Sequence, residues 1–207
     1  MTRPIIITGT DTDAGKTVFA AALTQALGAH YWKPVQAGLD GGSDAGTVTS
    51  LGIPADRVLA EAYRLTTPCS PHRAAEIDRT TIDPARLALP EIAGPLVVEA
   101  AGGALVPITR DLLYADLFAC WACPVVIVAR TALGTINHSL LTIEALRARG
   151  VPILGIAFNG NANEDSEATI AAFGRIKHLG RLPRLDPLDP ARLHRAFAES
   201  FDVADFA

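Results

Sequence analysis

The chain has 207 residues, of which 49% are hydrophobic and 19% are charged, and its formal net charge is −4. This composition is typical of a well-packed globular protein, so we expect one domain over residues 1–207. The acidic balance gives no electrostatic case for binding nucleic acid or an anionic membrane surface. No apolar run approaches a membrane span, and no basic region with an apolar signal core opens the chain. The three cysteines, an odd number, argue against a disulfide framework and predict a cytoplasmic protein.

The start of the chain combines a short strand, a glycine-containing loop and a helix. Residues 5–7 are an apolar run typical of a buried strand, 9–17 read Gly-Thr-Asp-Thr-Asp-Ala-Gly-Lys-Thr, and 18–27 are typical of a helix. Backbone N–H groups at a helix start have no partners inside the helix and, with the helix dipole, favour an anion. We therefore predict a phosphate-binding loop, with Lys16 on the terminal phosphates and the Thr17 hydroxyl on their magnesium ion.

The spacing of this loop is unusual. Five residues separate Gly9 from Gly15, whereas the common pattern G-x-x-x-x-G-K-[ST] has four, and Thr10 stands where the first glycine is usual. The alternative is a strand–helix turn that contains Gly-Lys-Thr by chance. Because strand, loop and helix all agree with the motif, the phosphate-binding loop is favoured.

The rest of the chain alternates predicted strands and helices. We expect strands at 30–35, 95–99, 125–128, 152–158 and 177–183. We expect helices at 44–51, from 83–84, at 112–121, from 136, after 163 and after 189–190. Loops or turns are expected at 36–43, 63–72, 100–103 and 131–135.

This alternation predicts an α/β fold of the P-loop NTPase type, with a mostly parallel central sheet and helices on both faces. In such sheets ligands bind at the carboxyl ends of the strands. The loop 9–17, Lys33, Glu99, the segment after Arg130 and Asn159 all lie at or just past predicted strand ends. We therefore expect them to surround one crevice.

Three charged residues at this crevice have more than one interpretation. Glu99 ends an apolar strand, where a carboxylate needs a metal ion or a cluster of donors; the alternative is a helix-capping or salt-bridged glutamate. Asp44 is a second candidate magnesium ligand or a plain helix N-cap. Lys33 is a second cation beside Lys16 that would suit a transferring phosphoryl group, or a surface lysine.

Cys120 and Cys123 form a Cys-x-x-Cys pair. Such a pair suits a redox or zinc site, but no second pair follows it. The pair also lies where an apolar helix leads into a strand. Buried, inert thiols are therefore the favoured interpretation.

Several segments resemble the dethiobiotin synthetase family, the ATP-dependent carboxylases of biotin synthesis. They are Gly-Thr-Asp-Thr-Asp-Ala-Gly-Lys-Thr at 9–17, Tyr-Trp-Lys-Pro-Val-Gln-Ala-Gly at 31–38, Ser-Asp-Ala at 43–45, Ser-Pro-His at 70–72, Val-Glu-Ala-Ala-Gly-Gly at 98–103 and Leu-Gly-Thr-Ile-Asn-His-Ser-Leu-Leu-Thr at 133–142. The longer loop spacing is the family's own form, which makes the first segment specific. The family usually carries a hydroxyl residue in place of Ala37 and a glycine in place of Ala100, and the C-terminal quarter matches it loosely.

The resemblance implies a homodimeric enzyme that acts on 7,8-diaminopelargonic acid, CO₂ and ATP with Mg²⁺. One amine takes up CO₂ to form a carbamate, and ATP phosphorylates a carbamate oxygen. The second amine then attacks the carbonyl carbon, closes a cyclic urea and expels phosphate. This task is positioning and charge neutralisation, and it needs no nucleophilic side chain.

The resemblance also implies roles for individual residues. Lys16 and Lys33 would be catalytic, straddling the γ-phosphate and the carbamate. The nucleotide would be bound by Thr12, Asp13, Ala14, Gly15, Lys16, Thr17, Glu99, Gly102, Asn159, Leu182 and Pro183. The metal ligands would be Thr17, Asp44 and Glu99. The diamine would be bound by Thr12, Lys33 and Ala37, and its carboxylate by the start of a partner-chain helix at Gly134, Thr135, Ile136 and Asn137.

Two other classes of P-loop protein are alternatives. An enzyme that activates a carboxylate for amidation, as in cobyrinic acid synthesis, would usually carry a glutaminase domain, for which 207 residues leave no room. A partitioning or metal-delivery ATPase would usually carry a further lysine early in its loop. Residues 10–14 contain no lysine, so the sequence favours the dethiobiotin-forming ligase.

Overall fold

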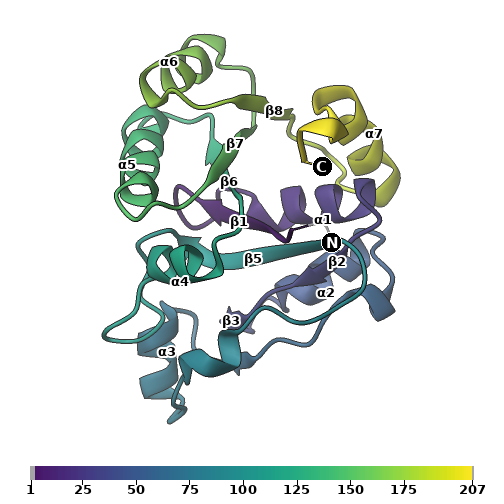
Figure 1. Cartoon of the computed structure of the whole chain (residues 1–207). Helices are drawn as coiled ribbons and strands as arrows, with labels where there is room; N and C mark the ends of the chain where they lie inside the picture. Colours follow the sequence, from purple (N-terminus) through teal and green to yellow (C-terminus); the bar gives the residue numbers. More distant parts are fainter. Residues whose placement is uncertain (1–2, 207) are drawn as a thin grey trace.

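The central element of the structure, a computed structural model that describes residues 3–206, is a six-stranded sheet. Neighbouring strands all run parallel, in the order β2-β5-β1-β6-β7-β8 (Figure 1). The strands are β1 (Ile5–Gly9), β2 (His30–Trp32), β5 (Leu96–Gly103), β6 (Val125–Arg130), β7 (Ile153–Asn159) and β8 (His178–Leu182). The predicted α/β fold with a parallel central sheet is confirmed.

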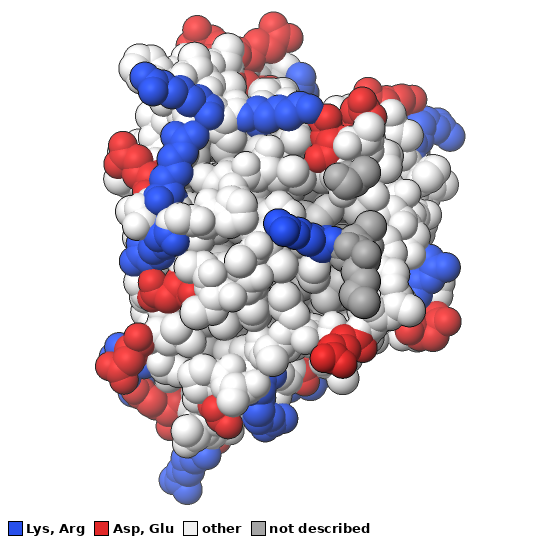
Figure 2. Space-filling model, in the orientation of Figure 1, with Lys and Arg blue, Asp and Glu red and all other residues white. Residues whose placement is uncertain are grey.

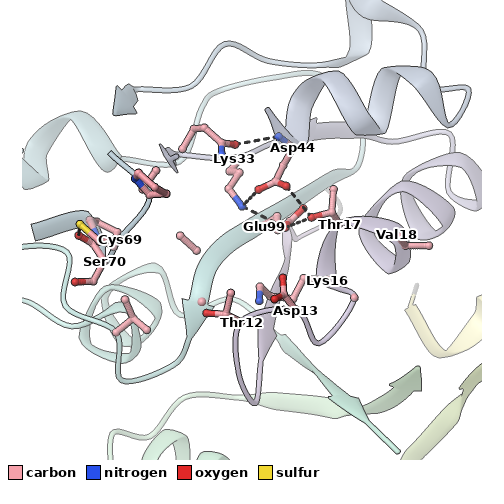
Figure 3. Close-up of a pocket in the computed structure, with 18 residues that line it drawn as sticks. Thr12, Asp13, Lys16, Thr17, Val18, Lys33, Asp44, Cys69, Ser70 and Glu99 are labelled. Carbon is pink, nitrogen blue, oxygen red and sulfur yellow. Dashed lines mark hydrogen bonds and ion pairs between the residues drawn. The ribbon is translucent and has the colours of Figure 1, made fainter. Parts of the chain in front are cut away.

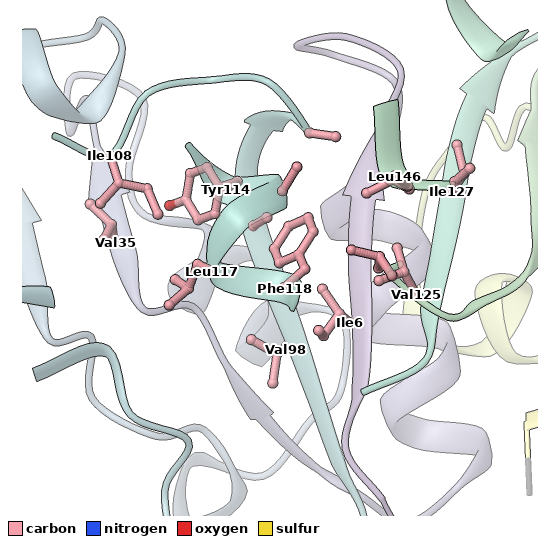
Figure 4. Close-up of a cluster of buried hydrophobic side chains, with 14 of the residues drawn as sticks. Ile6, Val35, Val98, Ile108, Tyr114, Leu117, Phe118, Val125, Ile127 and Leu146 are labelled. Atoms are coloured by element: carbon pink, nitrogen blue, oxygen red, sulfur yellow. The ribbon is translucent and has the colours of Figure 1, made fainter. Parts of the chain in front are cut away.

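Helices cover both faces of this sheet. On one face lie α1 (Lys16–Ala26), α2 (Asp44–Ser50) and α7 (Pro190–Ser200). On the other lie α4 (Tyr114–Trp121), α5 (Thr135–Arg147) and α6 (Glu164–Gly174). Helix α3 (Pro71–Ile77) belongs to the same core but packs against a separate pair of short strands, described next. Side chains alternate between the two cores: Val125 and Ile127 of β6 pack under α4 and α5 (Figure 4), whereas Val126 packs under α1. Because both faces are buried, the strands are continuous apolar runs in the sequence.

The strand predicted at 30–35 is interrupted. It ends at Trp32, and the chain then forms β3 (Val35–Ala37), which pairs with β4 (Tyr63–Leu65) in a separate two-stranded sheet. Pro34 lies at the break; it has no N–H to donate, and its carbonyl accepts from the Tyr63 N–H at 3.1 Å. The prediction of loops throughout 36–43 and 63–72 is therefore wrong, because strands this short carry too little pattern to detect.

Strand β5 is longer than predicted. It continues through residues 100–103, which were predicted to form a turn. Gly103 pairs with Gly9 of β1 after a register shift, and a Cβ atom on Gly103 would lie 3.3 Å from the Gly9 carbonyl oxygen. The glycine that suggested a turn instead permits a close approach of two backbones. Glu99 consequently lies inside a strand rather than at its end.

Three further differences concern helices. Helix α3 (Pro71–Ile77) was not predicted, because its first residues lie in the segment 63–72 that was expected to be irregular. The helix predicted from 83–84 is a single 3₁₀ turn, Pro84–Leu87, and α4 begins two residues later than predicted. The remaining predicted strands and helices agree with the structure to within about two residues at each end.

Only one of the two cysteines in the Cys-x-x-Cys pair is buried. Cys123 is buried, and burial raises the pKa of its thiol, but Cys120 is exposed on the surface of α4, so the prediction of two buried thiols is wrong. The two separate because Ala122, with a positive φ of 50°, ends the helix between them. Among residues 3–206 no three His, Cys, Asp or Glu side chains gather as a metal site, so the pair lacks partners for zinc.

The surface carries both signs of charge. Figure 2 shows Lys and Arg interspersed with Asp and Glu over the face seen in Figure 1. None of the helices within residues 3–206 is both long enough and apolar enough to cross a membrane.

A cluster of aromatic rings fixes α1 against the C-terminal part of the chain. Phe19, in the second turn of α1, is fully buried. Its ring lies 5.9 Å from that of Phe197, 5.4 Å from that of Phe201 and 6.2 Å from that of Phe206. Aromatic pairs at these separations contribute beyond their buried area. The helix that follows the phosphate-binding loop is thus held by residues of α7 and of the segment after it.

We expect Phe19→Ala to lower the free energy of unfolding by about 3–5 kcal/mol, because it leaves a cavity among three rings. Phe173, which is 76% exposed on α6, is the matched control, and Phe173→Ala should change the free energy by less than about 0.5 kcal/mol. Urea unfolding measures both. Equal losses from the two substitutions would contradict the role of the cluster.

Candidate active site

A cavity of about 670 Å³ opens at the carboxyl ends of β1, β2 and β5 (Figure 3). It is lined by ten of the predicted site residues: Thr12, Asp13, Gly15, Lys16, Thr17, Lys33, Ala37, Asp44, Glu99 and Gly102. The walls opposite the loop come from Cys69, Ser70 and Val106. The structure therefore brings most of the predicted residues to one crevice, as the strand order requires.

The phosphate-binding loop is held tightly against its neighbours. Gly15 has a φ of 84° and precedes the first residue of α1, and a Cβ atom there would lie 2.2 Å from Nδ2 of Asn159. That Nδ2 donates to the carbonyl oxygens of Ala14 at 2.8 Å and Gly15 at 3.0 Å. No side chain caps α1 among the described residues, so its first N–H groups are free to bind an anion.

Three oxygen-bearing side chains meet at the base of the cavity. The Thr17 hydroxyl lies 2.8 Å from Oε1 of Glu99 and 3.1 Å from Oδ1 of Asp44. Asp44 is not the N-cap of α2: Ser43 is, and its Oγ accepts from the Gly46 N–H at 3.1 Å. The Asp44 carboxylate is therefore free to face the cavity. Two carboxylates and a hydroxyl are the hard oxygen donors that Mg²⁺ prefers.

Lys33 is buried among these acids and is not a surface lysine. Its Nζ contacts the Asp44 carboxylate and lies 3.3 Å from Oε1 of Glu99. Burial alone lowers its pKa, but Glu99 and Asp44 outweigh burial and raise it above the usual range, so Lys33 keeps its proton. Glu99 correspondingly has the cluster of donors that its buried position requires.

Lys16 differs electrostatically from Lys33. Its Nζ donates to the backbone carbonyl of Asp11 at 3.0 Å. Burial lowers the pKa of Lys16, Glu99 opposes that effect, and the nearby Lys33 charge adds to it. Two ammonium groups thus share one cavity, and an anion bound between them would stabilise both.

Sequence reasoning missed two buried residues that support this site. The Tyr31 hydroxyl donates to Oε2 of Glu99 at 2.8 Å, and burial, followed by the Glu99 charge, raises the pKa of Tyr31 well above its usual value. Gln36 accepts from the Asp44 N–H at 3.0 Å and donates to the Gly38 carbonyl at 3.0 Å. The available signal for Tyr31 was a hydroxyl in a buried strand, which needs a polar partner.

A second cavity, of about 390 Å³, lies on the other side of the loop. It contains the predicted nucleotide residues Asp13, Ala14, Gly15, Asn159, Leu182 and Pro183. Arg130, Thr131 and Ala132 also line it, which places the start of the segment after β6 near the loop as expected. Asn159 lines this cavity, and its Oδ1 is buried and has no hydrogen-bond partner among the described residues.

The predicted residues 134–137 line neither of these two cavities. They form the start of α5, where Gly134 has a φ of 93° and no side chain caps the helix in the described structure. The expectation that the whole segment after Arg130 faces one crevice is therefore only partly met. A third cavity, of about 400 Å³, separates the loop from α5 and is lined by residues that include Thr12, His138 and Thr142.

The fold and these cavities define a P-loop nucleotide-binding protein. The AAA domain family matches residues 3–192. ATP-dependent dethiobiotin synthetase BioD of Novosphingobium aromaticivorans is 68% identical over 203 residues, covering 98% of each chain. The protein of the same name from Rhizorhabdus wittichii is 63% identical over the whole of both chains. The chain therefore belongs to the dethiobiotin synthetase family.

Solved structures agree on the fold alone. The septum site-determining protein MinD of Pyrococcus horikoshii, 14% identical, matches all of this chain and 89% of its own with a TM-score of 0.58. A ParA family ATPase from Chlorobium tepidum, 11% identical, matches 99% of this chain and 96% of its own with a TM-score of 0.51. Because the relatives with high sequence identity are named dethiobiotin synthetases, a partitioning function is not favoured.

We expect Tyr31→Phe to lower the free energy of unfolding by about 1–3 kcal/mol, because it leaves a buried carboxylate oxygen of Glu99 without a donor. Tyr114→Phe is the control: Tyr114 is equally buried but does not donate to Glu99, and its loss should stay below about 1 kcal/mol. Guanidinium unfolding measures both variants. A smaller loss for Tyr31→Phe than for Tyr114→Phe would contradict the importance of this bond.

Proposed function

We propose that the protein forms dethiobiotin from 7,8-diaminopelargonic acid, CO₂ and ATP. The observation that carries this proposal is the large cavity, in which Lys16 and Lys33 lie at the free N-terminus of α1 beside the acids Asp44 and Glu99. Membership of the dethiobiotin synthetase family over nearly the whole chain supports it.

The residues act by positioning and neutralising charge. The carbamate of the diamine lies between Lys16, Lys33 and Thr12, which hold one carbamate oxygen toward the γ-phosphorus. Phosphoryl transfer forms a bond from that oxygen to phosphorus and releases ADP. The free amine then forms the second C–N bond, and the C–O bond to phosphate breaks. The two ammonium groups stabilise negative charge on the transferring and departing phosphate.

Thr17, Asp44 and Glu99 are the residues that would hold Mg²⁺. They fit the ion because both carboxylates lie within hydrogen-bond distance of the Thr17 hydroxyl, so three oxygen donors converge. When bound, the ion neutralises phosphate oxygens. The Asp44 and Glu99 carboxylates also compensate the Lys33 charge, so the same two acids would serve both Lys33 and Mg²⁺.

The diamine pocket differs from the family's usual form. Ala37 lines the cavity but supplies no hydroxyl. The Ser70 hydroxyl lines the same cavity, from the segment that leads into α3, and we propose that it binds the diamine in place of the missing group.

We further propose a cytoplasmic homodimer. Leu105 and Leu141, beside the third cavity, are 51% and 56% exposed, and Leu133 at the start of α5 is fully exposed. Burying these side chains against a second copy would bring the free N–H groups at 134–137 to the substrate carboxylate in the partner's cavity. The free cysteines at 69, 120 and 123 fit a reducing compartment.

The test is to supply 7,8-diaminopelargonic acid, bicarbonate, ATP and Mg²⁺ and to detect the cyclic urea by mass spectrometry. We expect product from the wild type, none without Mg²⁺, and at least about 10²-fold slower turnover for Lys16→Ala. Circular dichroism should show an unchanged fold for that variant. A wild type that makes no cyclic urea would overturn the function, and wild-type turnover by Lys16→Ala would overturn the role of the loop.

The second cavity predicts which bases are accepted. Both Nδ2 protons of Asn159 are used by loop carbonyls, so only its buried Oδ1, an acceptor, remains for the base. Adenine and cytosine present an amino group at the corresponding edge, whereas guanine and uracil present a carbonyl.

We expect kcat/KM to be at least about tenfold higher with ATP than with GTP. The guanine carbonyl has no proton to donate, so it would leave Oδ1 of Asn159 unpaired. CTP should likewise exceed UTP. Steady-state rates with the four nucleotides at fixed diamine measure this preference. Equal kcat/KM for ATP and GTP would show that Oδ1 does not contact the base.

A further inference from the structure

Two side chains at neighbouring strand ends hold the phosphate-binding loop at its two ends. Arg130 of β6 and Asn159 of β7 are partners in the parallel register, so both project toward the loop. Asn159 donates to the carbonyls of Ala14 and Gly15, at the end of the loop. Arg130 donates from Nη2 to Oδ2 of Asp11, at its start, at 3.2 Å.

Asp11 is an unfavourable charge for a loop that binds a polyanion. Its Oδ1 accepts from the Thr12 N–H at 2.7 Å, and its backbone carbonyl accepts from Nζ of Lys16 at 3.0 Å. Asp11 itself lines the third cavity, but Thr12 and Lys16, to which it is bonded, line the large cavity where the phosphates would bind. Without a counter-charge, the Asp11 carboxylate beside these two residues would oppose the binding of a polyanion to them.

Arg130 supplies the counter-charge from the wall of the second cavity. Its side chain is 45% exposed and that of Asp11 is 46% exposed, so the pair adds little to the stability of the fold. Arg130 nevertheless lines the same cavity as Asp13 and Gly15. Its effect should therefore appear in nucleotide binding rather than in folding.

We propose that Arg130 is a positioning residue for the nucleotide: it neutralises Asp11, so that the negative charge of this carboxylate does not oppose the triphosphate at the loop. This inference rests on the proposed function, because it concerns the same nucleotide. Asp11 thus stabilises the turn by accepting from the Thr12 N–H, while its negative charge opposes nucleotide binding unless Arg130 neutralises it.

The test is a double-substitution cycle read out by ATP affinity. We expect Arg130→Ala to raise the Kd and KM for ATP about fivefold at low salt, with less effect at 0.5 M salt and with kcat and the KM for diamine within about twofold of wild type. Asp11→Asn keeps the acceptor for the Thr12 N–H but removes the charge, so the double variant Asp11→Asn/Arg130→Ala should recover wild-type affinity. The control is Lys177→Ala. Lys177 lies just before β8, and its exposed ammonium pairs with Asp205, so this variant should not change the Kd for ATP.

Isothermal titration calorimetry with ATP and Mg²⁺ gives the Kd without turnover. Unchanged ATP affinity in Arg130→Ala would overturn the proposal, as would a double variant that binds as weakly as Arg130→Ala. A Kd change that persists undiminished at high salt would also overturn it. These ratios are separate from the test of the function, which is the formation of cyclic urea by the wild type.

Discussion

The buried carboxylate of Glu99 is the constraint on which the site depends. An ionised glutamate inside a parallel strand is very unfavourable unless donors surround it. Here three donors come from two parts of the chain: Thr17 of α1, and Tyr31 and Lys33 in and just beyond β2. Satisfying one charge therefore fixes the helix after the loop, the edge strand and the second cation relative to the centre of the sheet.

The same compensation sets the electrostatic state of the cavity. Lys33 keeps its proton because Asp44 and Glu99 outweigh its burial, whereas Lys16, which has no such direct ion pair in the described structure, has its pKa lowered by burial. The cavity thus contains one compensated and one poorly compensated ammonium. A triphosphate would supply the charge that Lys16 lacks, so ligand and site stabilise each other through the same interactions.

The sequence predicted those parts of the molecule whose pattern is local. The loop 9–17, the continuous apolar run of β6 and the cap of α6 at Asn163 are visible in adjacent residues, and the crevice follows from parallel strand order. Tyr31 and Gln36 were missed because their roles depend on partners 68 and 8 positions away, Glu99 and Asp44. The continuation of β5 was missed because Gly102 and Gly103 are typical of a turn, whereas here the small residues allow β5 to lie against β1.

The lengthened loop is preorganised by packing. A Cβ atom on Gly9 would lie 2.7 Å from the Asp11 carbonyl and 2.9 Å from Nζ of Lys16, and one on Gly15 would overlap Asn159. Both glycines are therefore required by contacts within the site, in addition to the positive φ of Gly15. Because Asn159 of β7 donates to the carbonyls of Ala14 and Gly15, the end of the loop and its donors for the phosphates are already oriented before a nucleotide binds. Binding energy is then not consumed in ordering the loop, which leaves more of it for aligning the carbamate with the γ-phosphate.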